Sequence, residues 1–315
     1  MQDRKKALVL LNMGGARSKD ELKMFLTNMF NDKNILTIKS NFLRKIVAFF
    51  ITNRRVDDAW KNYELIGNSS PINPLTEKLV EKCNDKIDDY KIYQVMRYTP
   101  PFAKDVIADI LKDGISEIVL LPLYPQYSTT TTKSSIEDFI DFLPYSFGQN
   151  IRYIESFYKN DAFNSLIIKE LEKNFENKDE YKEFNLIFSA HGLPQKIVDN
   201  GDPYEKQMIE HVEILSKKLE EKNIDFKSIN LAYQSKVGPM KWLEPSLEDK
   251  LNSFKDEKVI IYPLSFIIDN SETDFELDIE YRHIANNLGI KEYKVCKCVN
   301  DSEEFVEAIK DICNI

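Results

Sequence analysis

The chain is poor in cysteine and histidine, and it has no long apolar run. Its 315 residues include four cysteines and three histidines. The cysteines show neither CxxC spacing nor a dense framework, so we expect a reduced chain in the cytoplasm; they are Cys83, Cys296, Cys298 and Cys313. No apolar stretch reaches the roughly 20 residues that a helix needs to cross a bilayer. The polar start, residues 1–6, does not indicate a signal peptide.

Several catalytic motifs are also absent. The sequence has no GxGxxG fingerprint, Walker A loop, GxSxG elbow or HExxH pair. Dinucleotide enzymes, nucleoside-triphosphate enzymes, serine hydrolases and zinc proteases therefore lose their main support. The net charge of −9 argues against a nucleic-acid partner, which would require a basic surface. With 43% hydrophobic and 30% charged residues, the chain is typical of a folded globular protein.

The sequence does contain a regular alternation of strand-like and helix-like segments. Short apolar runs are separated by amphipathic stretches, a pattern that predicts parallel strands connected by helices. The expected strands are Lys5–Leu11, Lys91–Tyr98, Glu117–Tyr124, Ile151–Phe157, Asn185–Ala190, Asn230–Gln234, Val259–Leu264 and Glu292–Cys296. We therefore predict an α/β protein in which parallel sheets are flanked by helices.

The two halves of the chain share this order and carry similar loops. The loop pairs are Asn12-Met-Gly-Gly15 with Ser189-Ala-His-Gly192, Arg97-Tyr-Thr-Pro-Pro101 with Gln234-Ser-Lys-Val-Gly-Pro239, and Leu121-Pro-Leu-Tyr124 with Tyr262-Pro-Leu-Ser265. Such correspondence predicts two like domains, residues 1–160 and 161–315. The terminal helix, residues 302–313, is a candidate to return to the first domain.

Residues 35–60 form a basic and apolar segment centred on Phe42–Arg55. The segment is too short to span a membrane and too apolar for an ordinary surface loop. Two interpretations stay open: an amphipathic flap that covers an apolar ligand or contacts a membrane surface, or a helix of the core.

Ligands of open α/β sheets bind at the carboxyl ends of the strands, so functional residues are expected in the loops that follow them. The candidates there are Met13, Arg97, Tyr98, Tyr124, Gln126, Tyr127, His191, Gln234, Lys236 and Trp242. His191 is either a structural histidine or a proton-transfer group. Trp242 is either a core anchor or a flat wall for a planar ligand. Ser128 and the threonines after it either bind a carboxylate or phosphate or cap a helix.

An acidic stretch, Asp269–Tyr281, follows the strand that begins at Val259. Asp269, Asn270 and Ser271 are cap residues, so a helix is expected to begin here. On an α-helix, Glu272, Glu276 and Glu280 would form one stripe, with about 6 Å between successive turns. Such a stripe is either a solvated acidic face or a path of hard oxygen ligands for a divalent cation or for protons.

Taken together, these blocks resemble the ferrochelatase family, which inserts ferrous iron into porphyrins. The matching blocks occur in the family's order and cover nearly the whole chain: Asn12–Gly15, Gly67 with Ser70–Ile72, Arg97-Tyr98, Tyr124–Ser128, Ser189–Pro194, Tyr233–Met240 with Trp242-Leu243, and Glu272-Thr273 with Glu276–Tyr281. The resemblance implies two Rossmann-like domains of the chelatase type, with the active-site cleft between them.

The resemblance also implies roles for individual residues. His191 matches the active-site histidine and would accept the pyrrole protons, with Glu272 as its carboxylate partner. Glu276 and Glu280 match an acidic line, often described on a π-type helix, that would relay metal or protons. The metal-site residues are then His191, Glu272, Glu276 and Glu280. The expected substrate-binding residues are Met13, Arg97, Tyr98, Tyr124, Gln126, Ser128, Lys236 and Trp242.

Some positions depart from the family pattern. Asn270 stands where some members have a second histidine, so a histidine pair on the metal path is not expected. The chain lacks the cysteine-bearing tail of some members, so we expect no [2Fe-2S] cluster and no other tightly bound cofactor. Met13 favours protoporphyrin IX, because the coproporphyrin-using branch tends to carry tyrosine there. We expect a monomeric cytoplasmic enzyme that contacts a membrane surface through the segment 35–60.

Three alternatives stay open for the function. The chain could be a coproporphyrin III ferrochelatase, a cobalt or nickel chelatase for another tetrapyrrole, or a non-catalytic haem or porphyrin carrier. Ferrous iron enters the expected reaction as a substrate and not as a cofactor.

Overall fold

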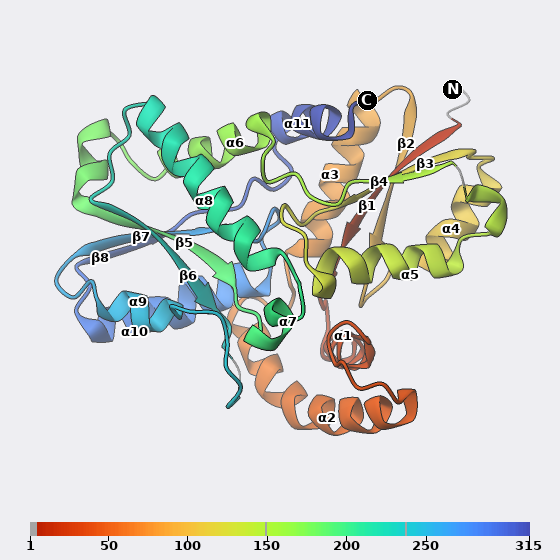
Figure 1. Cartoon of the computed structure of the whole chain (residues 1–315), viewed down its shortest axis with the longest axis horizontal. Helices are drawn as coiled ribbons and strands as arrows, with labels where there is room; N and C mark the ends of the chain where they lie inside the picture. The colour runs from red at the N-terminus through yellow and green to blue at the C-terminus, as the bar shows by residue number, and fades with distance from the viewer. Residues whose placement is uncertain (1–4, 149, 237) are drawn as a thin grey trace. The chain divides into compact units, whose positions relative to one another are not determined.

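The structure is a computed structural model of the chain, and it describes residues 5–148, 150–236 and 238–315. Two predictions fall partly outside the described residues. The argument about a signal peptide depends on residues 1–4, and the predicted Gly-Pro loop includes Val237. The chain forms two compact units (Figure 1): unit 1 comprises Met1–Ser156 with Asp301–Ile315, and unit 2 comprises Phe157–Asn300.

Unit 1 contains a parallel four-stranded sheet in the order β2-β1-β3-β4. Its strands are β1 (Lys6–Asn12), β2 (Tyr90–Met96), β3 (Glu117–Pro122) and β4 (Ile151–Tyr153). Its helices are α1 (Lys19–Asn31), α2 (Asn41–Leu65), α3 (Ile72–Lys86), α4 (Ala103–Lys112), α5 (Ser134–Phe142) and α11 (Glu303–Cys313), with a π-helical turn η1 (Thr129–Lys133) and a 3₁₀ turn η2 (Tyr145–Phe147).

Unit 2 contains a second parallel sheet, in the order β6-β5-β7-β8. Its strands are β5 (Phe184–His191), β6 (Ser228–Gln234), β7 (Lys258–Pro263) and β8 (Glu292–Val295). Its helices are α6 (Asp161–Glu172), α7 (Gln195–Asp199), α8 (Tyr204–Glu221), α9 (Leu247–Asn252) and α10 (Tyr281–Leu288), with a 3₁₀ turn η3 (Lys178–Glu183) and a π-helix η4 (Glu272–Glu280).

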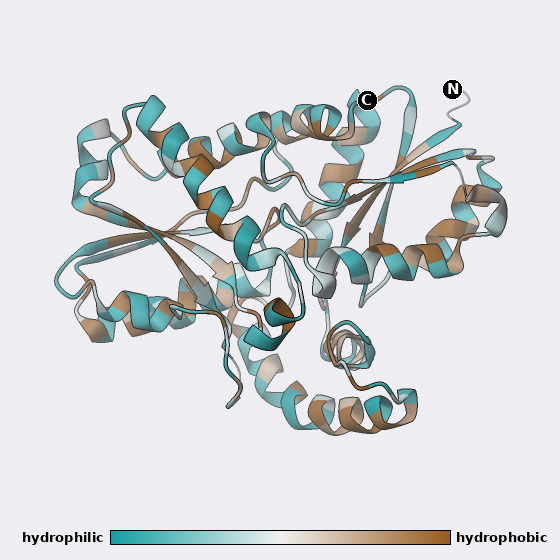
Figure 2. Ribbon diagram, viewed as in Figure 1, coloured by the Kyte–Doolittle hydropathy of each residue, from teal (hydrophilic) through white to brown (hydrophobic). Residues whose placement is uncertain are grey.

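The predicted α/β class and parallel pairing are confirmed. The central strands are apolar on both faces because helices cover both faces of each sheet. In β1, Val9 and Leu11 pack against α4 and α5. By the alternation of a strand, Leu8 and Leu10 point to the opposite face, where they are also fully buried. In unit 2, α9 and α10 cover one face, and α6 and α8 lie on the other (Figure 1). Figure 2 shows the resulting hydrophobic colouring of the strands.

The residue pairing supports the predicted internal repeat and aligns it. Pro122 pairs with Leu11, and Pro263 pairs with Ser189. Met13, two residues after Leu11, is therefore the counterpart of His191. The same reasoning on β2 and β6 makes Arg97 the counterpart of Gln234 and Tyr98 that of Ser235. The likeness extends to the π-helices, because η1 follows β3 and η4 follows β7.

Two predicted elements differ from the structure. The acidic stretch, for which spacing alone predicted an α-helix, is the π-helix η4, as the family resemblance implied, and it continues as α10 only from Tyr281. The strand expected to reach Cys296 ends at Val295, so Cys296 and Cys298 lie in the buried segment that follows β8. The Cys298 amide in that segment donates a hydrogen bond to Asp269 (3.1 Å), and this contact holds the segment beyond the sheet.

The predicted segment 35–60 becomes α2, and only one side of this helix is buried. Ala48, Thr52 and Val56 pack against α1 in a small satellite core. The first half of the helix exposes Phe42, Leu43, Ile46, Phe49 and Phe50, with Phe42 72% and Phe50 68% exposed. The interpretation as a core helix is therefore wrong for this side. No helix within residues 5–148, 150–236 and 238–315 is long and apolar enough to span a membrane.

Candidate functional site

The predicted site residues divide equally between the two units. Unit 2 holds His191, Lys236, Trp242, Glu272, Glu276 and Glu280, and unit 1 holds Met13, Arg97, Tyr98, Tyr124, Gln126 and Ser128. Within each unit these residues lie at or beyond the carboxyl ends of the strands, as the fold class predicts.

His191 is the last residue of β5, and its main chain is fixed on two sides. Its amide donates to the Ser265 hydroxyl (2.9 Å), and its carbonyl accepts from the Tyr204 hydroxyl (3.0 Å). Its Nδ1 lies 2.9 Å from Glu272 Oε2, and its side chain is 38% exposed. The structure thus holds an imidazole rigidly against a carboxylate while leaving it accessible to a ligand.

Glu272 and Glu276 are joined by donors from the end of β6. Gln234 Nε2 donates to Oε2 of both carboxylates (3.2 and 3.3 Å). The Ser235 hydroxyl lies 2.6 Å from Glu276 Oε2 and 3.4 Å from Glu272 Oε2. Because Ser189 donates to Gln234 Oε1 (2.7 Å), the amide is oriented with its nitrogen toward the carboxylates.

These contacts shift the pKa values of His191, Glu272 and Glu276 to different extents. Burial opposes charge on His191, but the Glu272 carboxylate outweighs it and raises the His191 pKa to about 9. Burial acts against ionisation of Glu272 as well, yet the charge of His191 and the hydrogen bonds lower the Glu272 pKa. Burial and the nearby charge of Glu272 raise the pKa of Glu276 to about 7. At neutral pH the site therefore holds a His191–Glu272 ion pair beside a partly protonated Glu276.

The stripe expected from α-helical spacing is only partly present. Asn270 caps η4, because its Oδ1 accepts from the Glu272 amide (2.8 Å). Glu280 lies at the exposed end of η4, and partial desolvation of its carboxyl group, together with the nearby charge of Glu248, raises its pKa. Among the residues that the structure describes, no three His, Cys, Asp or Glu side chains are grouped as a metal centre. The carboxylates are held by hydrogen-bond donors, a state compatible with weak, exchangeable binding of a cation.

Trp242 lies beside the loop that follows His191. Its main chain pairs with Pro194, and the next amide, that of Leu243, donates to the Leu193 carbonyl (3.0 Å). A Cβ on Gly192 would lie 2.6 Å from the Gln234 carbonyl oxygen and 3.4 Å from the Trp242 ring, so this close approach requires glycine. The tryptophan is half-buried and adjoins the histidine loop. Lys236 is exposed after β6.

In unit 1, Arg97 is bound to carboxylates. Its guanidinium lies 3.1 Å from Asp32 and 3.1 Å from Asp138, and Nε donates to the Ser134 hydroxyl (2.9 Å). The Tyr98 hydroxyl donates to the same buried Asp32 (3.0 Å), as does the Ser134 hydroxyl. The first unit thus places a compensated cation where unit 2 has Gln234.

The remaining predicted residues of unit 1 surround this network or the turn η1. Met13 is half-buried directly after β1, and the Tyr124 hydroxyl lies 3.4 Å from the Ser135 hydroxyl. Gln126 is buried. Ser128 caps η1 by accepting from the Thr130 amide (3.2 Å), which matches the helix-cap interpretation of this loop.

Sequence reasoning missed several residues that organise the site. Ser235 lay inside a matching block but carried no signal of its own, and Ser189 and Ser265 had none either. Asp32 and Asp138 were missed because neither is near Arg97 in sequence. The one signal for them is Arg97 itself, because a cation at a buried strand end requires a carboxylate partner.

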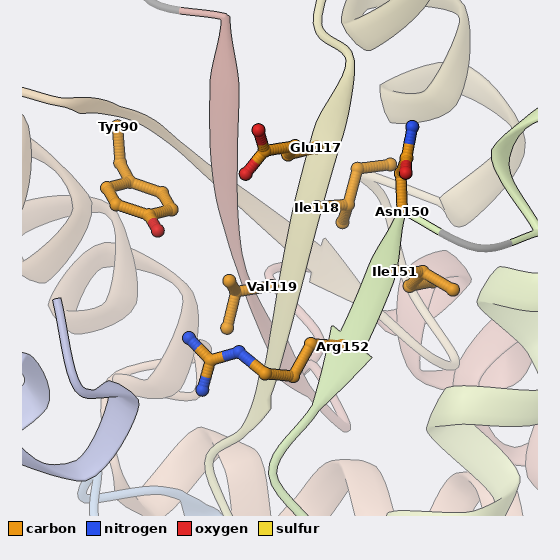
Figure 3. A pocket seen from close by; sticks show the side chains of 7 residues that line it. All are labelled: Tyr90, Glu117, Ile118, Val119, Asn150, Ile151 and Arg152. Atoms are coloured by element: carbon orange, nitrogen blue, oxygen red, sulfur yellow. The ribbon is translucent and has the colours of Figure 1, made fainter.

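A separate pocket of about 240 Å³ lies at the amino ends of the unit 1 strands (Figure 3). It is lined by Tyr90, Glu117, Ile118, Val119, Asn150, Ile151 and Arg152. Its charged groups already have partners: Glu117 pairs with Lys6 (3.3 Å), and Arg152 donates to the Cys313 carbonyl (2.6 Å). None of the predicted site residues lines this pocket.

Comparison with solved structures identifies a common fold. SirB from Bacillus subtilis, solved with Fe³⁺, is 10% identical and matches with a TM-score of 0.59, covering 98% of this chain and 96% of that one. CbiX, described as the terminal enzyme of sirohaem biosynthesis in denitrifying bacteria, is also 10% identical, with a TM-score of 0.54 over 97% and 98% of the two chains. At this identity the likeness shows the chelatase fold alone.

Sequence comparison is more specific. The ferrochelatase family model matches residues 5–314. Proteins named ferrochelatase from a Nitratiruptor species and from Sulfurimonas denitrificans are each 50% identical, over 309 and 311 residues and 98% of both chains. One from Helicobacter pylori is 47% identical over 308 residues, which are 97% of this chain and 91% of that protein. The chain therefore belongs to the ferrochelatase family, whose members are enzymes that insert a metal ion into a porphyrin.

Proposed function

We propose that the chain inserts ferrous iron into protoporphyrin IX, with His191 as the acceptor of the pyrrole protons and Glu272 as its partner. The observation that carries the proposal is the contact of 2.9 Å between His191 Nδ1 and Glu272 Oε2 at the carboxyl end of β5. Glu276, joined to Glu272 through Ser235, and Glu280 beyond it would pass the cation or protons along η4.

The chemistry explains why this pair is useful. Metal insertion releases two pyrrole protons as the divalent ion takes the four nitrogens, so a base must be ready when the ion arrives. With a pKa of about 9, His191 is protonated in the resting enzyme. A divalent cation at Glu272 would cancel the charge that holds this proton and so lower the His191 pKa. The imidazole would then become a base at the moment of metal arrival.

The choice of porphyrin rests on Met13, directly after β1. An apolar thioether favours the vinyl-bearing protoporphyrin over coproporphyrin III, which carries two further carboxylates. Assays with both porphyrins and with sirohydrochlorin, each with ferrous iron and with cobalt, separate the alternatives. Faster turnover of coproporphyrin would overturn the substrate proposal. Porphyrin binding with no metal-dependent change in the absorption spectrum would indicate a carrier and not an enzyme.

The decisive variants are His191→Ala and Glu272→Gln. Removing a general base costs about 100-fold to 10,000-fold in rate, so His191→Ala should reduce iron insertion by about 100-fold or more while porphyrin binding, followed by fluorescence quenching, changes little. His283→Ala is the matched control, because His283 is an exposed histidine of α10 in the same unit. Turnover of His191→Ala within threefold of the control would refute the assignment.

We also propose that α2 contacts a membrane surface. The exposed Phe42, Phe49 and Phe50 share one side of the helix with the exposed Lys45, while Arg54 and Arg55 are exposed further along it. Aromatic side chains beside cations are typical of helices that lie in the interface of anionic membranes. Protoporphyrin IX is itself poorly soluble, so a membrane-bound enzyme would meet its substrate there.

A further inference from the structure

Ser235 has an unusual backbone conformation. Its φ of +65° lies in the left-handed region, directly after the last residue of β6. The other non-glycine residues with positive φ in the described parts of the chain are Asn68, Asn223, Asp256, Asn300 and Asn314. Asparagine and aspartate tolerate this region, whereas serine adopts it at a conformational cost. A strained backbone conformation persists only where contacts of the surrounding structure hold it in place, and such residues are frequent at functional sites.

The conformation directs the Ser235 hydroxyl between two acidic side chains. The hydroxyl is within 2.6 Å of Glu276 Oε2 and 3.4 Å of Glu272 Oε2. Gln234, the residue before it, reaches the same two oxygen atoms from its Nε2. Because successive residues of a strand point to opposite faces, Gln234 and Ser235 could not both face the carboxylates if β6 simply continued. The left-handed turn at Ser235 brings the second donor to the same side.

The donors contact one oxygen atom of each carboxylate. The side-chain donors of Gln234 and Ser235 contact only Oε2 atoms, as His191 Nδ1 does, and the single Ser235 proton is donated to the nearer Glu276 Oε2. Within the described residues, no donor contacts Oε1 of Glu272 or Glu276. The two side chains are therefore held close together despite their like charges, with one oxygen atom of each uncommitted.

We infer that Ser235 is a positioning residue: its hydroxyl clips Glu276 Oε2 beside the Glu272 Oε2 that Gln234 also contacts, so that the two Oε1 atoms form a ready pair of ligands for the incoming divalent metal. The inference rests on the proposed role of these carboxylates. A site whose ligands are already in place binds without the cost of ordering them. Ser235 thereby affects the affinity for the metal and not the affinity for the porphyrin.

The test compares Ser235→Ala, Ser235→Gly and Ser235→Asn. Alanine and glycine both remove the hydroxyl, but glycine adopts positive φ without strain. Asparagine tolerates the conformation and supplies an amide donor. We expect the KM for ferrous iron to rise about tenfold in the Ala and Gly variants, the size of one lost hydrogen bond to a charged group. The KM for porphyrin should stay unchanged, and the Asn variant should recover the metal KM to within threefold.

Metal binding without turnover provides a second readout. Calorimetric titration of the porphyrin-free enzyme with Zn²⁺ should show the same loss of affinity in the Ala and Gly variants. Ser246→Ala is the matched control, because Ser246 also donates to a carboxylate of unit 2, Asp249 (2.5 Å), outside the site. Thermal unfolding should distinguish the strained Ala variant from the Gly variant, while their metal affinities agree.

The outcomes separate the clip from the function on which it rests. If Glu272→Gln keeps normal metal affinity and turnover, the carboxylate assignment itself is wrong. If Glu272→Gln loses both while the Ala and Gly variants of Ser235 bind metal as tightly as wild type or more tightly, the clip alone is refuted. A metal KM that rises for Ala but not for Gly would show that backbone strain, and not the hydroxyl, is responsible, and would also refute it.

Discussion

At the scale of single residues, the ion pair of His191 and Glu272 governs the charge of the site. The raised pKa of His191 depends on the Glu272 carboxylate, whereas burial acts in the opposite direction. Glu272→Gln removes the charge and keeps a side chain of similar shape. The pKa of His191 should then fall well below 9, because burial lowers it and the carboxylate that raised it is gone.

The three histidines of the chain make this prediction measurable by NMR titration of the imidazole protons. His211 is buried, and burial lowers its pKa to about 3, so it does not titrate in the same range. His283→Ala removes the other signal and completes the assignment. Zn²⁺ added to the wild-type enzyme should shift the His191 titration in the same direction as Glu272→Gln. A titration unmoved by the substitution would disprove the electrostatic coupling.

Residues of the candidate site could be located from the sequence only where it carried a local signal. His191 was identifiable as a rare residue after a buried strand, and Glu272 as the start of an acidic series. Ser235 had no such signal, because its importance comes from a backbone angle that the neighbouring strands and η4 impose. Asp32 was equally hidden, since it contacts Arg97 across 65 residues of sequence.

At the scale of elements, α2 has two apolar sides, and only one of them is buried within unit 1. Changing Phe49 and Phe50 to Ser removes two aromatic side chains that are 61% and 68% exposed, so the fold should be unaffected. Sedimentation with anionic vesicles should fall by at least about tenfold, given the apolar area lost from the contact.

The control for α2 is Leu111→Ser, which removes an apolar side chain that is 45% exposed on α4. This variant should sediment with vesicles as the wild type does. Equal partitioning of all three proteins would rule out α2 as the membrane contact. Loss of binding in high salt alone, with the phenylalanines irrelevant, would assign the contact to the basic residues.

The π-helices mark the limit of prediction from patterns of elements. The eight strands were predictable within a few residues, because buried parallel strands are continuously apolar, whereas the helices of the second half were expected only as connections between strands. The residues of η4 suit an α-helix equally well. In the folded unit Leu277 of this π-helix is buried, and Glu276 contacts the donors Gln234 and Ser235 at and beyond the end of β6.

At the scale of the whole molecule, the chain contains one architecture twice with different chemistry at equivalent places. Both sheets have the same strand order, and both third strands lead into a π-helix. At the shared positions, unit 2 has His191 and Gln234 beside two glutamates, whereas unit 1 has Met13 and the Arg97 cation. An arginine that already neutralises carboxylates leaves no site for a metal ion. The repeat was therefore predictable from sequence, but its division of roles was not.

The stability of unit 2 should be sensitive to acid because of its buried histidine, His211. His211 on α8 is fully buried and lies 2.8 Å from Asn164 Oδ1, and burial lowers its pKa from 6.5 to about 3. The unfolded chain binds this proton below pH 6.5 while the folded unit does not. The stabilisation is therefore complete above pH 6.5 and is lost as the pH falls toward 3, by at most about 1.4 kcal/mol per pH unit.

His211→Gln tests this, because glutamine can still donate to Asn164 but cannot be protonated. Denaturant unfolding between about pH 7 and pH 4 should show a shallower loss of stability for His211→Gln than for the wild type. His283→Gln, at the exposed position, should follow the wild type. The slope must be taken from the unfolding of unit 2 if the two units unfold separately. Parallel curves for all three proteins would mean that His211 carries its proton in the folded unit, and that its burial does not determine the acid stability of the enzyme.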